Sequence, residues 1–253
     1  MNSTIVGLIS IGCIFAGSLL GMGLQRLLPR HHLDTKTQDV VKLSAGTIAT
    51  LTALVLGLLV SSAKSSFDTI NNGLVQYSVK IIVLDRALAS YGPETKAVRE
   101  QMRRSVAASI EMLWPQEKTG VPVVKAMERT TGGDLMRDEL RKLTPTSDDQ
   151  RQILAQAQQA LGDIAQIRWL AIEQAHNELP LPLLVILVFW LTLLFVSFGL
   201  FAPPHMTAIS VTFVGACAVS AAIFLVLELN RPLDGMIKVS SASMMHALGQ
   251  LGH

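Results

Sequence analysis

The stretch LSAGTIATLTALVLGLLVSSA, residues 43–63, contains no Asp, Glu, Lys or Arg. A helix of roughly 20 predominantly apolar residues crosses a bilayer core of about 30 Å and satisfies its own backbone hydrogen bonds there. Three further stretches, residues 4–24, 181–201 and 206–227, are also uncharged and apolar over such a length. The sequence therefore predicts four transmembrane helices.

The composition agrees with a membrane protein. Charged residues make up 16% of the 253 residues and hydrophobic residues 50%, whereas soluble domains carry about 25% charged residues. The mean hydropathy is +0.43. A net charge of +2 gives no sign of the strongly basic surface that nucleic-acid binding requires. We expect membrane lipid around the chain and no nucleic-acid partner.

The order of the four spans predicts two hairpins around an inserted domain. A short Pro203-Pro204 turn joins the last two spans and favours an antiparallel pair. The predicted parts are a first transmembrane hairpin (1–63), a helical soluble domain (64–178), a second transmembrane hairpin (179–227) and a C-terminal soluble tail (228–253). No alternating strand pattern occurs. The expected fold class is therefore an all-α integral membrane protein whose termini and soluble domain share one side of the membrane.

The inserted domain is expected to begin as a continuation of the second span. No helix breaker occurs between Lys64 and Gly73, and apolar positions continue to the Tyr91-Gly92-Pro93 turn. The next helix has one apolar face, formed by Val98, Met102, Val106, Ile110 and Leu113, with Arg99, Glu100, Arg103 and Arg104 expected on the other side. A short helix is expected over residues 133–143.

A long helix is expected to start at a capping box. Ser147 is followed three residues later by Gln150, which is the pattern of reciprocal N-terminal hydrogen bonds. The residues that follow at helical spacing are Ile153, Ala157, Leu161, Ile164 and Arg168. The helix is expected to last until Pro180 and Pro182 and to lead into the third span.

Motifs for catalysis are absent from the sequence. There is no Gly-rich phosphate loop, nucleophile elbow, His-Glu-x-x-His or Cys-x-x-Cys pattern. We expect no enzyme activity, no catalytic residues, no metal site and no cofactor. Ion-coupled transporters usually place carboxylates or bases within their spans, and these spans carry none. A passive pore or a non-transporting membrane protein is therefore favoured.

One face of the second span combines hydroxyl groups and leucines. Three- and four-residue spacing places on it Ser44, Thr47, Thr50, Leu54, Gly57, Leu58 and Ser61, which we call the hydroxyl–leucine face. Small and hydroxylated residues allow membrane helices to pack closely, as we expect for Gly17 and Gly21 in the first span. The same pattern also suits a pore wall with hydroxyl-lined mouths and a leucine constriction. The spacing alone leaves both interpretations open.

Residues 55–68, VLGLLVSSAKSSFD, and residues 228–235, ELNRPLDG, resemble a bacterial bestrophin-like membrane domain family of uncharacterised function. This family is a distant relative of the bestrophin channels. The resemblance implies a passive ion channel, assembled as a homo-oligomer and specifically a pentamer, through which inorganic ions pass. It further implies a multi-pass protein of the bacterial inner (plasma) membrane, with the soluble domain and both termini in the cytosol.

The resemblance also implies a pore lined by the second transmembrane helix. The family's neck of three residues, four apart, falls on Thr50, Leu54 and Leu58, and Thr50 departs from the hydrophobic pattern of that neck. The expected pore-lining residues are Ser44, Thr47, Thr50, Leu54, Leu58 and Ser61, with Lys64 at the pore mouth. The alternative is a non-conducting membrane scaffold or sensor whose helical domain binds a partner.

The segment after the last span is expected to be structural. Glu228, Asn230, Arg231 and Asp234 are predicted to form a turn against the start of the helical domain. Calcium takes six to eight oxygen ligands, and Glu228 and Asp234 supply too few. We therefore expect no calcium site in this segment.

Overall fold

The computed structural model describes residues 3–29, 34–114, 132–176, 181–203, 205–233 and 235–252. These residues are almost entirely helical, and no strand occurs among them. The chain divides into two compact units. The membrane unit contains Met1–Ser65 and Glu178–Asn230, and the inserted unit contains Ser66–Asn177 and Arg231–His253. The residues after the last span therefore belong to the same compact unit as the insertion.

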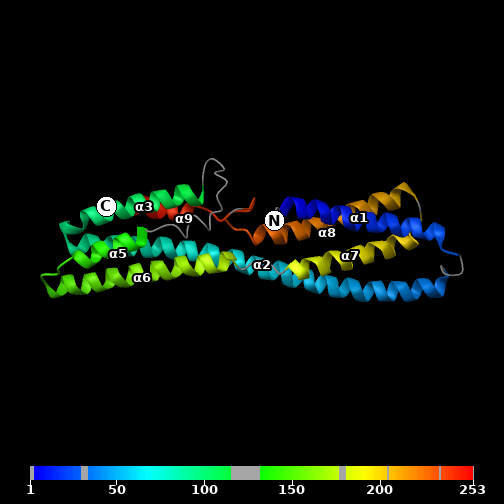
Figure 1. Ribbon diagram of the computed structural model, residues 1–253, viewed down its shortest axis with the longest axis horizontal. Helices are drawn as coiled ribbons and strands as arrows, with labels where there is room; N and C mark the ends of the chain where they lie inside the picture. The colour runs from blue at the N-terminus through cyan, green and yellow to red at the C-terminus, as the bar shows by residue number, and fades with distance from the viewer. Residues whose placement is uncertain are drawn as a thin grey trace. The chain divides into compact units, whose positions relative to one another are not determined.

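The membrane unit contains the four predicted spans (Figure 1). They lie in α1 (Ser3–Leu27), α2 (Thr35–Tyr91), α7 (Leu181–Phe201) and α8 (Met206–Leu229). Each of these helices is long and apolar enough to cross a membrane. The predicted all-α fold with four transmembrane helices is confirmed.

Glycines bring α1 and α7 into close contact. A Cβ atom added to Gly17 would lie 2.9 Å from the Cγ2 of Thr192. Added to Gly21 it would overlap the backbone oxygen of Val196, and added to Gly199 it would overlap the backbone oxygen of Ser18. Such small residues let helix backbones approach in lipid, where van der Waals packing drives association. The predicted packing role of Gly17 and Gly21 is confirmed.

The predicted continuation of the second span is also confirmed, because α2 is a single helix of 57 residues. It ends before Gly92, whose φ of 144° lies in the region that favours glycine. A 3-10 turn, η2 (Pro93–Thr95), follows. The buried hydroxyl of Thr95 donates to the carbonyl oxygens of Leu88 (2.5 Å) and Gly92 (2.8 Å), which fixes the corner between α2 and the next helix.

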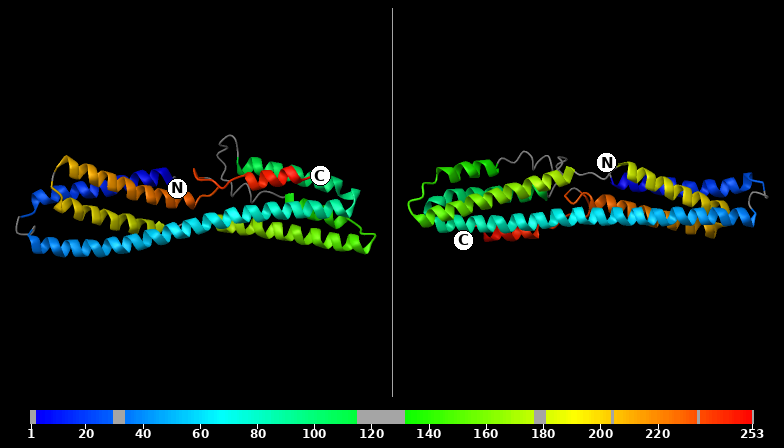
Figure 2. Two further views of the ribbon diagram at one scale, coloured as in Figure 1. Left: turned by 180° about the vertical axis from the view of Figure 1, so that it is seen from behind. Right: turned by 90° about the horizontal axis from the view of Figure 1, so that it is seen from below.

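The inserted unit packs short and long helices around the C-terminal half of α2 (Figure 2). They are α3 (Lys96–Leu113), α5 (Gly132–Lys142), α6 (Asp148–His176) and α9 (Ala242–Gln250). The predicted apolar face of α3 is confirmed, since Val98, Met102 and Val106 are buried against Leu84 and Leu88 of α2. Burial of this face in one cluster holds α2, α3, α5, α6 and α9 together.

The predicted capping box at the start of α6 forms with a shift of one residue. The backbone N–H of Gln150 donates to the Ser147 hydroxyl at 3.1 Å, as expected. The side-chain oxygen of Gln150 accepts from the backbone N–H of Thr146 (2.8 Å). The side-chain amide of Gln150 also donates to the carbonyl oxygen of Tyr91 (3.1 Å), which links the start of α6 to the end of α2.

The placement of Arg99 on the polar side of α3 was wrong. Its side chain is 17% exposed and forms a two-pronged ion pair with Asp85 of α2, which is 1% exposed. The Arg99 Nε lies 2.8 Å from Oδ1 and its Nη2 lies 2.9 Å from Oδ2. This hydrogen bonding raises the pKa of Arg99. The backbone N–H of Gly252 also donates to the Oδ2 of Asp85 at 3.4 Å, so one carboxylate joins α2, α3 and the C-terminal residues.

Replacing Arg99 with Met is expected to destabilise the inserted unit by about 3 kcal/mol, because it leaves the buried Asp85 carboxylate without its guanidinium partner. This expected loss of stability lies at the low end of the range for breaking a buried ion pair, since the backbone N–H of Gly252 still donates to the Asp85 carboxylate. Thermal unfolding in detergent should show a midpoint lowered by about 6 to 12 °C. Arg103→Met changes an exposed residue of the same helix and should shift the midpoint little. Equal shifts for the two variants would contradict the assigned role.

Candidate pore-lining surface

In the membrane unit, α2 buries one face and exposes the other. The buried face contains Ala45, Thr52, Leu59 and Ala63, which pack within the unit. Every residue of the hydroxyl–leucine face is exposed, as is Lys64. Leu54 is 61% exposed and Leu58 is 63% exposed. The packing interpretation therefore does not hold within one subunit, because this face contacts no other helix of its own membrane unit closely enough to be buried.

The hydroxyl groups at the start of this face bond to their own helix. The Ser44 hydroxyl donates to the carbonyl oxygen of Val40 at 3.0 Å, that of Thr47 donates to Leu43 at 3.2 Å, and that of Thr50 donates to Gly46 at 2.9 Å. These bonds use the hydroxyl hydrogens, while each oxygen keeps a lone pair that can accept from water. The surface is therefore mildly polar and carries no charge between Ser44 and Ser61.

The exposed surfaces of α1 and α7 are more apolar than this face. α1 exposes large apolar side chains such as Leu8 and Leu20, and α7 exposes Val185 and Phe189. Such side chains suit contact with lipid tails. The hydroxyl–leucine face instead exposes hydroxyls and a glycine, Gly57. A Cβ atom added to Gly57 would contact no other part of the described chain within 4 Å. The hydroxyls make this face of α2 more polar than the exposed surfaces of α1 and α7, and such a surface suits contact with water or with another helix.

Leu54 and Leu58 lie at the centre of the hydroxyl–leucine face. They are four residues apart and therefore stack one helical turn above the other. Thr50 lies one turn before them and Ser61 about one turn after them. The structure thus brings together all the predicted pore-lining residues on a single exposed strip, with two apolar residues between polar ends.

The residues predicted to form a turn lie where α8 ends. Glu228 is buried, and the backbone N–H of Asn230 donates to the carbonyl oxygen of Val226 at 3.2 Å. Beyond it, the N–H of Gly235 donates to the carbonyl oxygen of Arg231 at 2.8 Å. Asp234 lies outside the described residues. In the part of the chain that the structure describes, no group of three His, Cys, Asp or Glu side chains could hold a metal ion.

This turn leads into the core of the inserted unit. Leu233 and Val239 are buried in a cluster with Ile70 of α2 and Leu113 of α3. The backbone oxygen of Val239 also accepts a hydrogen bond from the indole N–H of Trp114 at 2.8 Å. These contacts anchor the segment after α8 beside the first turns of α2 in the inserted unit.

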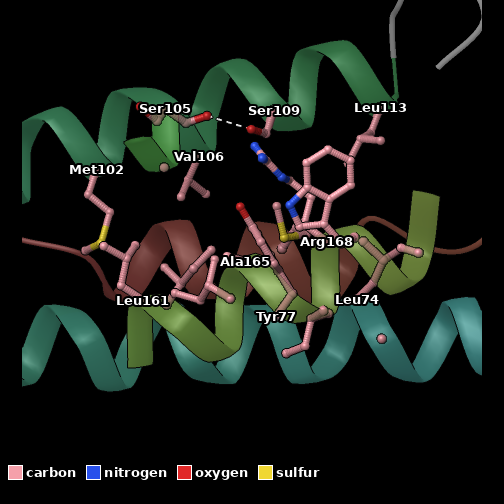
Figure 3. Close-up of a pocket in the computed structure, with 18 of the residues that line it drawn as sticks. Leu74, Tyr77, Met102, Ser105, Val106, Ser109, Leu113, Leu161, Ala165 and Arg168 are labelled. Carbon is pink, nitrogen blue, oxygen red and sulfur yellow. Dashed lines mark hydrogen bonds between the residues drawn. The ribbon is translucent and has the colours of Figure 1, made fainter. Parts of the chain in front are cut away.

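The inserted unit contains a cavity of about 160 Å³ that was not predicted from the sequence. Its described lining comes mainly from α2, α3 and α6, and Figure 3 shows the Tyr77 hydroxyl pointing into the space between these helices, towards which Arg168 extends. Burial raises the pKa of Tyr77, while the positive charge of Arg168 acts in the opposite direction. The sequence shows only that Arg168 follows Leu161 and Ile164 at helical spacing, and this does not indicate a cavity.

These features define an all-α membrane protein with two transmembrane hairpins and an inserted helical unit. The family model of the Bestrophin-like domain matches residues 12–244. The chain therefore belongs to the bestrophin-like family, which confirms the resemblance inferred from residues 55–68 and 228–235.

Solved structures show the same fold. A bacterial bestrophin homologue from Klebsiella pneumoniae matches in several single-substitution forms. One matches with a TM-score of 0.67 at 14% identity, covering 96% of this chain and 97% of that chain. Another matches with a TM-score of 0.68 at 14% identity, covering 96% of both chains. No curated protein matches this chain. At this identity the structural likeness establishes the fold alone.

Proposed function

We propose that the chain is one subunit of a homo-oligomeric passive ion channel whose pore is lined by the hydroxyl–leucine face of α2. The observation that carries the proposal is the exposure of this whole face in the isolated subunit. Membership of the bestrophin-like family supports it. Hydroxyls in a membrane span gain nothing from lipid tails, so contact with water in a pore explains their position better.

Several copies are needed because one helix face cannot enclose a path. In a ring of subunits, five by the family resemblance, Leu54 and Leu58 would form two apolar rings. The hydroxyls of Ser44 and Thr47 would keep one mouth wet, and Ser61 with Lys64 would line the other. No carboxylate lies on the hydroxyl–leucine face, so inorganic ions would cross without a coupling site, down their own gradient.

Two measurements test the proposal: the oligomeric state of the purified protein, and the loss of ion flux when an introduced cysteine is modified. Purified protein in nanodiscs should have a mass several times that of one 27.4 kDa chain. In liposomes, ion flux through a Thr47→Cys variant lacking the native cysteines should fall when a positively charged, water-soluble thiol reagent is added. Thr52→Cys offers a matched control, because Thr52 is buried on the opposite face of α2. A monomer, or oligomers without ion flux, would favour the scaffold or sensor function.

We further propose that the protein is a multi-pass protein of the bacterial inner membrane, with the inserted unit and both termini in the cytosol. The even number of candidate spans supports a common side for the termini and the inserted unit. In a variant lacking the native cysteines, Lys142→Cys should resist a membrane-impermeant maleimide in intact cells and react after permeabilisation. Thr35→Cys, at the first residue of α2, should react in intact cells. The reverse pattern would overturn this orientation.

A further inference from the structure

The cavity of the inserted unit has the size of a small ring compound. Its volume is about 160 Å³, and an apolar protein cavity of about 150 Å³ binds benzene. The cavity therefore fits a ligand of about one six-membered ring with a small substituent.

The walls of the cavity favour an aromatic ring. Four methionines line it, Met102, Met112, Met136 and Met244, and most of the remaining lining is aliphatic. A methionine thioether is polarizable, adapts to the shape of a guest, and makes favourable contacts with aromatic rings. Four such side chains around one small cavity can surround a flat ring more closely than branched aliphatic residues can.

The polar groups of the cavity favour a negative charge on the ligand. The described lining includes Arg168 and contains no Asp or Glu. The Arg168 Cζ lies 5.5 Å from the centroid of the Trp169 ring, a cation–π contact that orients the guanidinium. The Tyr77 hydroxyl is neutral at pH 7, as for an ordinary tyrosine, and can donate a hydrogen bond; burial raises its pKa further. The Ser109 hydroxyl hydrogen is bonded to the Ser105 carbonyl oxygen at 2.8 Å.

We infer that the inserted unit binds a small aromatic carboxylate of about the size of benzoate in this cavity. The ring lies among the methionines, and the carboxylate accepts from the Tyr77 hydroxyl and the Arg168 guanidinium. A carboxylate suits these donors because it is planar and has two oxygens, which match the fork of an arginine. A larger, more highly charged anion such as a phosphate would place oxygens against apolar walls without partners.

Binding is measured by ¹⁹F NMR of 4-fluorobenzoate added to the full-length protein in nanodiscs. We expect 4-fluorobenzoate to bind at least about tenfold more tightly than 4-fluorotoluene, since a hydrogen bond to a charged group contributes about 1.5 to 3 kcal/mol. Tyr77→Phe keeps the ring and removes only the hydroxyl, so it should weaken 4-fluorobenzoate binding about tenfold and leave 4-fluorotoluene unaffected. Equal affinity for the two compounds would overturn the assignment of an anionic ligand.

A substitution that reduces the cavity volume tests whether the ligand binds there. Ala165 lines the cavity from α6, so Ala165→Leu should fill part of it and abolish 4-fluorobenzoate binding. Ala155→Leu is the matched control, because Ala155 is exposed on the same helix. Binding that survives Ala165→Leu, or that is lost equally in both variants, would overturn the site. If Ala165→Leu lowers the thermal midpoint strongly, the Tyr77→Phe result decides alone. This inference does not depend on ion conduction, so an absence of ion flux would leave it intact.

Discussion

Leu54→Ala and Leu58→Ala are each expected to raise the single-channel current about threefold or more and to leave the thermal unfolding midpoint of the subunit nearly unchanged. A narrow ring of leucines excludes water because it offers a hydrated ion no hydrogen-bond partner. Truncating one ring widens and wets it. Both side chains are more than half exposed in the subunit, so their removal leaves no cavity within the subunit. Planar-bilayer recording and thermal unfolding of the same preparation measure the two effects.

Leu59 provides the matched control for this experiment. It is adjacent to Leu58 on the same helix, but it is buried in the core of the membrane unit. Leu59→Ala should therefore cost roughly 2 to 5 kcal/mol in stability, by analogy with soluble cores, and should not raise the current. If Leu54→Ala and Leu58→Ala behave as Leu59→Ala does, the two leucines are packing residues and most of the case for conduction is lost.

Gly199→Leu is expected to prevent the native contact between α1 and α7 and to destabilise the membrane unit by about 4 kcal/mol or more. A Cβ atom at Gly199 already overlaps the backbone oxygen of Ser18, and backbone atoms cannot rotate away as a side chain can. Overpacking of a well-packed core usually costs about 1 to 3 kcal/mol. A larger value is expected here because the two helices must separate along their contact. The yield of folded protein after detergent extraction measures the effect.

Gly12→Leu is the corresponding control on α1. A Cβ atom at Gly12 meets nothing within 4 Å, so a leucine there points away from the rest of the membrane unit. Its folded yield should match that of the unmodified protein. Normal folding of Gly199→Leu would show that α1 and α7 do not approach as closely as described.

The long helices were predictable because their causes are local. The continuity of α2 follows from the lack of a breaker before Gly73 and from the Gly92-Pro93 corner that ends it. The start of α6 follows from Ser147 and Gln150. Each of these signals acts within a few residues of the chain, so the sequence shows it directly. The Gln150 side-chain oxygen accepts from the backbone N–H of Thr146 rather than that of Ser147. This difference depends on the exact backbone geometry, which a sequence pattern does not show.

The parts that could not be predicted depend on packing between distant segments. The pair of Asp85 and Arg99 exists because the corner at Gly92 turns α3 back against α2. On a helical wheel Arg99 borders the polar face, and nothing in the sequence shows that a carboxylate lies opposite. The cavity beside Tyr77 likewise arises where α2, α3 and α6 fail to fill the space between them. Its volume is a property of three helices together.

For the hydroxyl–leucine face of α2, the periodicity indicated which residues share the face but not what surrounds them. Ser44 and Leu54 share a helix face in any α-helix, and that face can be buried or exposed. The structure shows the face exposed in one subunit. Whether this face lines a pore is tested by the mass of the protein in nanodiscs and by the loss of ion flux when Thr47→Cys is modified.

The internal hydroxyl bonds of α2 have a consequence for biogenesis. A newly inserted subunit meets lipid before it meets other copies, and an unsatisfied donor in hydrocarbon costs several kcal/mol. Ser44, Thr47 and Thr50 each donate to a carbonyl one turn earlier, so the lone subunit presents none of these hydrogens to lipid. A single chain is therefore compatible with surrounding lipid along this part of α2, before any contact with another helix.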